Sequence, residues 1–221
     1  MKILNLYAGI GGNRKLWGNE HEVTAVEIDP EIAKIYKDFF PNDKVVVADA
    51  HQYLLDNYNK FDFIWSYPPC PSHSRVRKAA HQQNKPIYPE MSLYQEILFL
   101  QGYFKGKWVV ENVISWYDPL IKPYQVGKHY YWANFPITNI HDPKGRGMGR
   151  NENLQDLYKL KGFKLDKYQM IDKMKTIRNC VEPEEALHIF EIAFKENQSI
   201  LLEISQQKRQ NEEQATQGDK Q

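Results

Sequence analysis

The chain has 221 residues, of which 42% are hydrophobic and 26% charged, and its formal net charge is +1. This composition is ordinary for a single globular domain, and the longest apolar runs, VVVA and ILFL, are far too short to span a bilayer. The first residues show no signal-peptide layout, and only two cysteines, Cys70 and Cys180, are present. These features exclude a membrane span and a disulfide framework, and we expect a reducing, cytoplasmic setting.

Short apolar runs recur along the first half of the chain, and helical patterns separate them. Because the intervals leave room for crossover helices, the pattern predicts a doubly wound, Rossmann-like α/β fold with a parallel sheet. The predicted strands lie near residues 2–7, 22–28, 44–48, 61–67 and 107–113.

Three segments have amphipathic helical patterns. The first, DPEIAKIYKDFF, begins with Asp29 as its cap and Pro30 in its first turn. The second is expected from about Glu90 to Phe104, and the third is EPEEALHIFEIAF. Residues 71–89 have no strand pattern and are predicted to form a functional loop or lid.

The chain is expected to divide into four parts. Residues 1–137 would form the catalytic and cofactor-binding domain, and residues 138–176, rich in Gly, Lys and Asn, a small recognition insertion. Residues 177–205 would return as a C-terminal helix, and the tail 206–221 lacks apolar residues and is predicted to be disordered.

The turn after the first predicted strand contains Gly9, Gly11 and Gly12, which permit close approach of a nucleotide-like ligand or simply a tight turn. The second and third strands end at Glu27 and Asp49. Either acid alone could be a helix cap or a surface charge, but together they indicate an adenosine-ligand site. Since the turn lacks the G-x-G-x-x-G pyrophosphate pattern, S-adenosylmethionine fits better than a dinucleotide.

The fourth strand ends in two prolines followed by Cys70. Both prolines fix their own backbone and cannot donate to a ladder, so they end the strand in a rigid turn. Cys70 is either a reactive side chain mounted on that turn or a small buried hydrophobe. Glu111 ends the fifth strand at the same edge of the sheet.

Charge is unevenly distributed along the chain. Residues 71–178 contain 18 basic and 9 acidic residues, a net charge of +9, whereas residues 1–70 carry −3 and residues 179–221 carry −5. A basic middle between acidic ends indicates either a polyanion partner or a solvated lysine-rich surface.

The ordered motifs G-I-G-G, V-E-I-D-P, A-D-A, P-P-C, E-N-V and R-N-C-V-x-P resemble those of the cytosine carbon-5 DNA methyltransferase family, from about Ile3 to Phe194. The resemblance implies methyl transfer from S-adenosylmethionine to cytosine in double-stranded DNA, by a monomer in a bacterial or phage-infected cell. It implies that Cys70 adds to carbon 6 of a flipped base while Glu111 protonates ring nitrogen 3.

The resemblance also assigns binding residues. Asn112 would hold the Glu111 loop by hydrogen bonds. The expected cofactor contacts are Tyr7, Gly9, Ile10, Gly12, Glu27, Ile28, Asp49, Ala50, Pro69 and Asn179. The expected DNA contacts are Ser74, Arg75, Arg77 and Lys78.

The chain departs from the family at several positions. Pro71 and His73 replace the glutamine and phenylalanine that usually follow the catalytic cysteine. The arginine-bearing Q-x-R-x-R strand appears only as GKHYYWANF, so that Lys128 or His129 would take the role of the base-orienting arginine.

Three alternatives remain open at this point: a cytosine-5 methyltransferase acting on tRNA, an amino-group methyltransferase, and a catalytically weakened DNA-binding relative. The tRNA enzymes share almost every motif, whereas amino methylation does not need the thiol at Cys70. No Cys/His spacing indicates a metal site. His21, His51 and His188 are expected on the surface or in helices, and Cys180 is expected to be a packed small residue.

Overall fold

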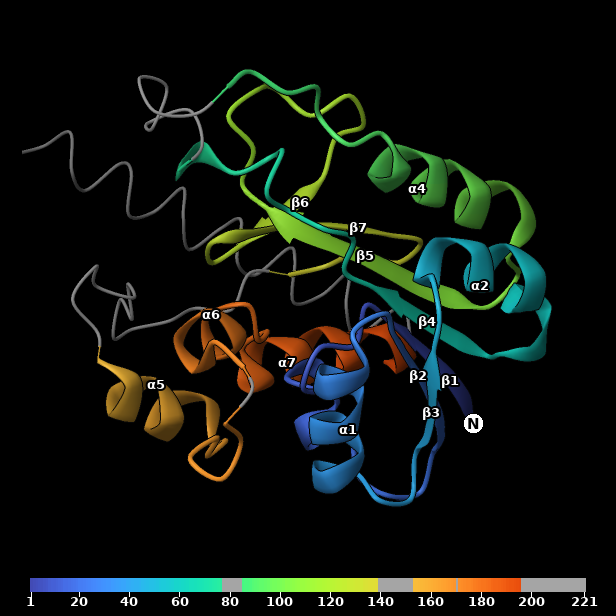
Figure 1. The fold of residues 1–221 in the computed structure, drawn as a ribbon. Helices are drawn as coiled ribbons and strands as arrows, with labels where there is room; N and C mark the ends of the chain where they lie inside the picture. The colour runs from blue at the N-terminus through green and yellow to red at the C-terminus, as the bar shows by residue number, and fades with distance from the viewer. Residues whose placement is uncertain (77–84, 139–152, 170, 196–221) are drawn as a thin grey trace, which may run out of the picture.

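A mixed β-sheet forms the centre of the structure, a computed structural model that describes residues 1–76, 85–138, 153–169 and 171–195. Its strands are β1 (Lys2–Leu6), β2 (Glu22–Glu27), β3 (Lys44–Val47), β4 (Phe63–Ser66), β5 (Lys107–Val113), β6 (Tyr124–Val126) and β7 (His129–Ala133). They lie in the order β3-β2-β1-β4-β5-β7-β6 (Figure 1). The first five strands run parallel, as the sequence predicts, whereas β7 is antiparallel to β5 and to β6.

The strand order places a topological switch point between β1 and β4. From β1 the chain moves outward through β2 to β3 and then returns to β4 on the other side of β1. In open α/β sheets, ligands bind at such a point, beyond the carboxyl ends of the strands. The turns at Tyr7 and Tyr67, which follow β1 and β4, therefore flank the expected binding crevice.

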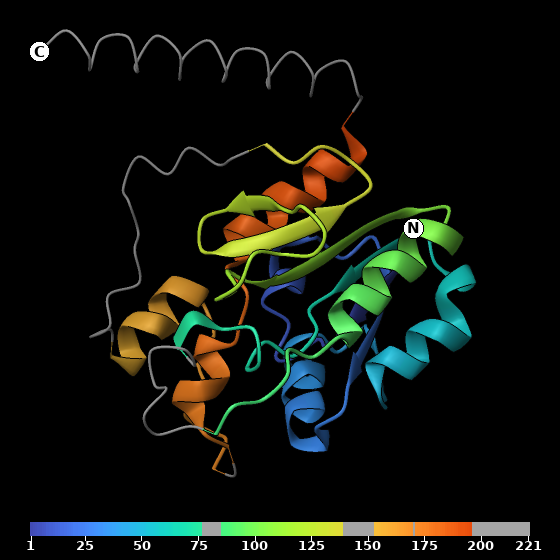
Figure 2. The same ribbon diagram turned by 90° about the horizontal axis from the view of Figure 1, so that it is seen from above.

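Helices cover both faces of the sheet (Figures 1 and 2). The apolar side chains of β1 alternate between the two layers: Leu4 and Leu6 pack towards α2 and α4, and Ile3 packs towards α7. No helix among the described residues is long and apolar enough to cross a membrane. The helices are η1 (Asn13–Leu16), α1 (Pro30–Phe39), α2 (Ala50–Asn57), η2 (Tyr58–Lys60), α4 (Ser92–Tyr103), α5 (Leu154–Lys161), α6 (Lys173–Arg178) and α7 (Pro183–Phe194).

Helix α1 begins as its sequence predicts. The side chain of Asp29 accepts hydrogen bonds from the backbone amides of Glu31 and Ile32, and Pro30 occupies the first turn. Helix α2 lies between β3 and β4, in one of the intervals where the strand pattern predicts a crossover helix. Asp49 caps it by accepting from the amide of Gln52 at 2.9 Å.

The described part of the predicted recognition insertion packs onto the sheet domain. Leu157, Phe163 and Leu165 share one hydrophobic cluster with Ile10 and Ile35. This part of the insertion thus helps to form the core behind the glycine turn, and its role in target recognition stays a prediction. Residues 77–84, 139–152, 170 and 196–221, which include the end of the predicted C-terminal part 177–205 and the whole predicted tail, lie outside the described part of the chain.

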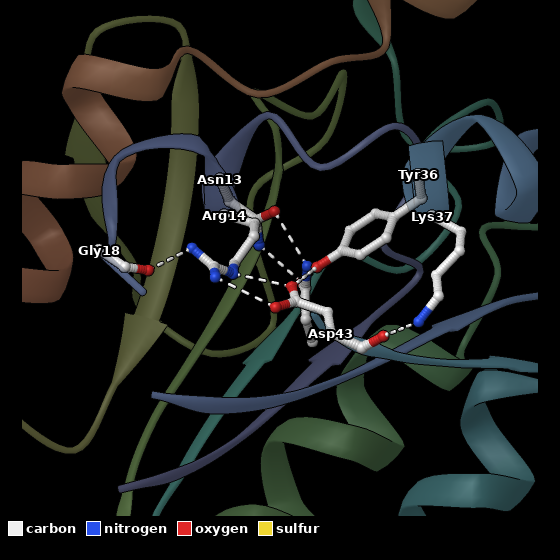
Figure 3. A network of polar contacts seen from close by, with 7 residues as sticks. Asn13, Arg14, Gly18, Tyr36, Lys37 and Asp43 are labelled. Carbon is white, nitrogen blue, oxygen red and sulfur yellow. Dashed lines mark hydrogen bonds and ion pairs between the residues drawn. The ribbon is translucent and has the colours of Figure 1, made fainter. Parts of the chain in front are cut away.

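A buried polar network anchors the turn that follows the glycines (Figure 3). The guanidinium of Arg14 donates to both carboxylate oxygens of Asp43, at 2.8 and 3.1 Å, and to the carbonyl of Gly18. Tyr36 of α1 donates its hydroxyl to the same carboxylate at 2.8 Å. Because Arg14 and Asp43 are both 3% exposed, this paired charge fixes η1 against α1 and so fixes the end of the glycine turn.

Candidate active site

The three glycines after β1 have different surroundings. A Cβ at Gly9, where φ is +53°, would meet nothing within 4 Å. At Gly11 it would lie 2.3 Å from the ring of Phe40, and at Gly12 it would lie 2.4 Å from both the Cys180 Sγ and a backbone oxygen. Gly9 alone therefore leaves open space for a ligand, and the other two glycines permit close internal packing.

Glu27 shapes the same turn with its carboxylate. Its Oε2 accepts from the amide of Gly9 at 2.9 Å, and its Oε1 accepts from the amide of Asp29 at 3.0 Å. The side chain is half-buried, and each carboxylate oxygen can accept a further hydrogen bond from a ligand hydroxyl. Glu27 thus holds the backbone of the glycine turn and retains capacity to bind a ribose.

A cavity of about 750 Å³ opens at the carboxyl ends of the strands. This volume is within the range of small-molecule sites. Five of the predicted cofactor residues line it: Tyr7, Ile28, Asp49, Ala50 and Pro69. The apolar faces of Ile28 and Pro69 and the carboxylate of Asp49 suit an adenine ring and its amino group.

The other predicted cofactor residues lie outside this lining. Ile10 is buried in the cluster beneath α1, Gly12 contacts Cys180 and Val181, and Asn179 is exposed at the end of α6. Cys180 is itself buried, as expected for a packed small residue.

Glu96 of α4 is a polar residue that the sequence analysis missed. It is 1% exposed, and its Oε1 lies 2.6 Å from the hydroxyl of Tyr7 and 3.0 Å from the Nδ1 of His51. Its Oε2 accepts from the hydroxyl of Ser66. The hydrogen bond to Glu96 raises the pKa of His51, which lies in α2 and lines the cavity. The only sequence signal was a charge on the apolar side of a helix, between Leu93 and Leu100.

Cys70 lies on a turn held by two sets of hydrogen bonds. The backbone amides of His73 and Ser74 donate to the Cys70 carbonyl, at 3.0 and 3.1 Å. Asn112 donates from its side chain to the carbonyl of Pro68 at 3.0 Å, which ties the turn to the end of β5. Burial raises the pKa of the Cys70 thiol, and a hydrogen bond with Tyr67 partly opposes this effect.

Glu111 is completely buried near the end of β5, beside β4, the strand that leads into the Cys70 turn. Neither of its carboxylate oxygens has a hydrogen-bond partner within the described ranges. Burial raises the pKa of Glu111 to about 7, and the nearby His129 opposes that rise. The Nδ1 of His129 lies 3.7 Å from the Glu111 Oε1, whereas Lys128 is exposed, so of the two candidates His129 is the one beside Glu111.

The predicted nucleic-acid contacts follow the Cys70 turn. Ser74 pairs with Ser115 in an isolated bridge, and the exposed Arg75 donates its Nε to the Ser115 carbonyl at 3.2 Å. Arg77 and Lys78 lie outside the described residues. His73 is buried, with its Nδ1 2.6 Å from the hydroxyl of Tyr117. The described segments contain no group of three side chains suited to hold a metal ion.

Comparisons with known proteins give one family. Residues 1–113 match the family model described as C-5 cytosine-specific DNA methylase. No curated protein sequence matches the chain.

Solved structures provide partial likenesses. DNMT2 of Spodoptera frugiperda is 20% identical over 64% of this chain and 53% of that chain, with a TM-score of 0.43. A DNA modification methyltransferase encoded in an Escherichia coli prophage is 23% identical over 52% of this chain and 32% of its own, with a TM-score of 0.34. NSun6 of Pyrococcus horikoshii, solved with SFG, is 20% identical over 52% of this chain and 34% of its own chain, with a TM-score of 0.39. The chain spans about half the length of the DNMT2 structure.

Proposed function

Because the chain belongs to the C-5 cytosine-specific DNA methylase family, we propose that it methylates carbon 5 of cytosine in double-stranded DNA, acting as a monomer. The family and the Rossmann-like methyltransferase fold are those that the sequence motifs predict, and the cofactor is S-adenosylmethionine. DNA as the substrate and the role of each residue are the proposed part.

The cavity at the switch point suits this cofactor. Tyr7, Ile28, Asp49 and Pro69 would hold it there, with Gly9 leaving room beside the first turn. When bound, the cofactor supplies an electrophilic methyl group on a sulfonium sulfur, which carbon 5 of cytosine accepts only after the ring has been activated.

Cys70 and Glu111 would activate the ring. The Cys70 thiolate forms a bond to carbon 6 and breaks the double bond between carbons 5 and 6, while Glu111 gives its proton to ring nitrogen 3. After methylation of carbon 5, water removes the proton that remains there. The double bond re-forms, Cys70 leaves as thiolate, and the proton on nitrogen 3 returns to Glu111.

The state of Glu111 is the observation that carries this proposal. A fully buried carboxyl that accepts no hydrogen bond from the described residues, and whose pKa is near 7, keeps its proton at a pH where an exposed glutamate has lost it. It lies at the end of the strand next to the one that positions Cys70. A proton donor and a nucleophile at neighbouring strand ends are what addition to an aromatic ring requires.

The two groups have their pKa values in reversed order. Cys70 must lose a proton and Glu111 must keep one, yet the pKa of Cys70 is raised above 9.0 and that of Glu111 is about 7. The reactive combination is therefore a minor form at every pH. Its population rises about tenfold per pH unit up to about pH 7 and then stays constant until the thiol itself ionises.

We assign the remaining parts of the chain on the same basis. Residues 1–137 would form the catalytic domain, 138–176 a small target-recognition region, and 177–205 the returning C-terminal helix. The net charge of +9 in residues 71–178 supports a nucleic-acid partner, whose phosphates Arg75 would contact.

A fluorinated substrate tests the proposal. With fluorine at carbon 5 the final elimination cannot occur, so the protein with cofactor and fluorocytosine DNA should form a denaturant-resistant adduct on the Cys70 peptide. Cys70→Ala should lose adduct and turnover but bind cofactor, and Cys180→Ala, the matched control, should form the adduct. Near wild-type methylation by Cys70→Ala would overturn the proposed mechanism. Preferential methylation of tRNA over duplex DNA would overturn the proposal that DNA is the substrate.

A further inference from the structure

Glu185, on the first turn of α7, lies within the catalytic cluster although nothing in the sequence marks it. Its Oε1 is 3.3 Å from the Nδ1 of His129, and the same Nδ1 is 3.7 Å from the Oε1 of Glu111. One imidazole nitrogen therefore faces two carboxylates that come from β5 and α7. Of the two, Glu111 is fully buried, and the side chain of Glu185 is 13% exposed.

Three local features hold Glu185 in this place. The hydroxyl of Tyr131, a fully buried residue of β7, donates to the same Oε1. Gly127, in the turn between β6 and β7 at φ +52°, leaves the space that the carboxylate occupies, because a Cβ there would lie 2.7 Å from the Glu185 Oε2. Glu185 also lies in the first turn of a helix of 12 residues, where backbone amides favour a negative charge.

We propose that Glu185 is a positioning residue of the catalytic centre, which holds the ring of His129 against Glu111 and balances its positive charge. This inference rests on the proposed cytosine methylation. A lone imidazolium beside Glu111 would favour the ionised carboxylate and so remove the proton that ring nitrogen 3 needs. The Glu185 carboxylate offsets that attraction. A positively charged His129 can therefore lie next to Glu111 while Glu111 keeps its proton.

The charges around the cluster agree with this arrangement. Burial lowers the pKa of His129, but its hydrogen bond to Glu185 and the charges of both carboxylates raise it above the ordinary value. Burial is the main cause of the raised pKa of Glu111, His129 lowers it, and Glu185 raises it. Among the described residues, the other ionisable groups around the cluster include Lys161 from α5, which pairs with Glu182, and Tyr131 from β7. Tyr67 and Cys70 from the turn after β4 and Cys180 from the loop before α7 also belong to this set.

A purely structural role for Glu185 has to be separated from this one. The same contacts could serve only to fasten α7 to the β6–β7 hairpin. Glu185→Gln distinguishes the two roles, because the amide oxygen can still accept from Tyr131 and His129 while the charge is gone. Glu184→Gln is the matched control, since it removes an exposed carboxylate one residue earlier on the same helix.

The first measurement needs no substrate. NMR titration of labelled histidine, with the His129 signal assigned by His129→Asn, should show His129 losing its proton at lower pH in Glu185→Gln than in wild type. The expected shift is about one pH unit. Glu184→Gln should titrate as wild type. An unchanged His129 titration in Glu185→Gln would overturn the inference.

The second measurement is the pH dependence of kcat/KM for methyl transfer. In wild type the rise should end near pH 7, where Glu111 titrates with its neighbours as a unit. In Glu185→Gln, kcat/KM should stop rising at a lower pH than in wild type. The plateau value of kcat/KM should fall about tenfold for each pH unit by which that point moves. A shifted His129 titration with an unchanged rate profile would make Glu185 a structural residue and overturn its catalytic role. Absence of cytosine methylation by wild type would instead overturn the proposed function, and a shifted titration would still support the ion pair.

Discussion

Replacing Glu111 by glutamine should stabilise the protein at neutral and alkaline pH. The pKa of this carboxyl is about 7 in the folded protein, against an ordinary value of 4.5. Between these values the folded state holds the proton more tightly than the unfolded state does. The free energy of unfolding therefore falls as the pH rises through this window.

The size of the effect follows from the two pKa values. At about 1.4 kcal/mol per pKa unit, the difference between 4.5 and about 7 corresponds to about 3 kcal/mol. Glutamine is close in shape to the protonated acid and does not titrate. Glu111→Gln should thus equal wild type in stability below pH 4.5, gain stability as the pH rises, and exceed it by about 3 kcal/mol above pH 7.

Urea unfolding of both proteins at several pH values between 4.5 and 8.5 would measure this difference. Groups distant from Glu111 titrate alike in the two proteins and cancel, whereas the titration of His129, whose pKa the charge of Glu111 helps to raise, changes in the variant and is followed separately. Asp118→Asn, which removes an exposed carboxylate, should show no comparable pH-dependent gain. A difference between Glu111→Gln and wild type that does not change with pH would refute the reasoning, because Glu111 would then titrate normally in the folded state.

Further predictions concern the cofactor turn and the catalytic pair. Glu27→Ala should weaken S-adenosylmethionine binding by about 1.5–3 kcal/mol in calorimetry, the range for a charge-assisted hydrogen bond. Gly9→Ala should weaken cofactor binding and, because φ is +53° at this position, also lower the melting temperature, whereas Gly12→Ala should mainly lower the melting temperature, since its Cβ would collide with internal atoms. For wild type, kcat/KM should rise about tenfold per pH unit below pH 7 and then level off. A decrease of kcat/KM directly above pH 7 would contradict the reversed order of the Cys70 and Glu111 pKa values.

Local patterns predicted most of the fold. Each buried strand of the parallel sheet is a short apolar run, and the cap of α1 is visible in the residues Asp29 and Pro30. Helix α2, only eight residues long, lies in an interval where the strand pattern predicts a crossover helix, but its bounds were not predicted. Asp49 was expected as a helix cap or a surface charge or, together with Glu27, as part of a ligand site. The structure shows that the cap and the cavity lining are compatible roles for the same side chain.

The site was predictable only where its residues follow strand ends. Cys70, Glu111 and Asp49 occupy such positions, so the sequence order alone brings them to one edge of the sheet. Glu96 and Glu185 reach the site from helices, across 89 residues to Tyr7 and 56 residues to His129. No local pattern encodes a contact over such a separation, because it depends on how the helices pack on the sheet.

For two buried glutamates, Glu96 and Glu111, the structure predicts opposite effects of the same chemical change. Glu96 has three hydrogen-bonding partners on its two oxygens, whereas Glu111 has no hydrogen bond among the described residues and only the His129 Nδ1 at 3.7 Å. Glu96→Gln replaces one accepting oxygen by an NH₂ group that faces a donor, and it should destabilise the protein by about 1–3 kcal/mol. It should also release Tyr7 and His51 and so weaken cofactor binding. Glu111→Gln should stabilise the protein above pH 7 and abolish turnover. If both variants lost stability alike at pH 8, Glu111 would be a structural residue. Replacement of a catalytic group that destabilises the folded state should instead increase stability.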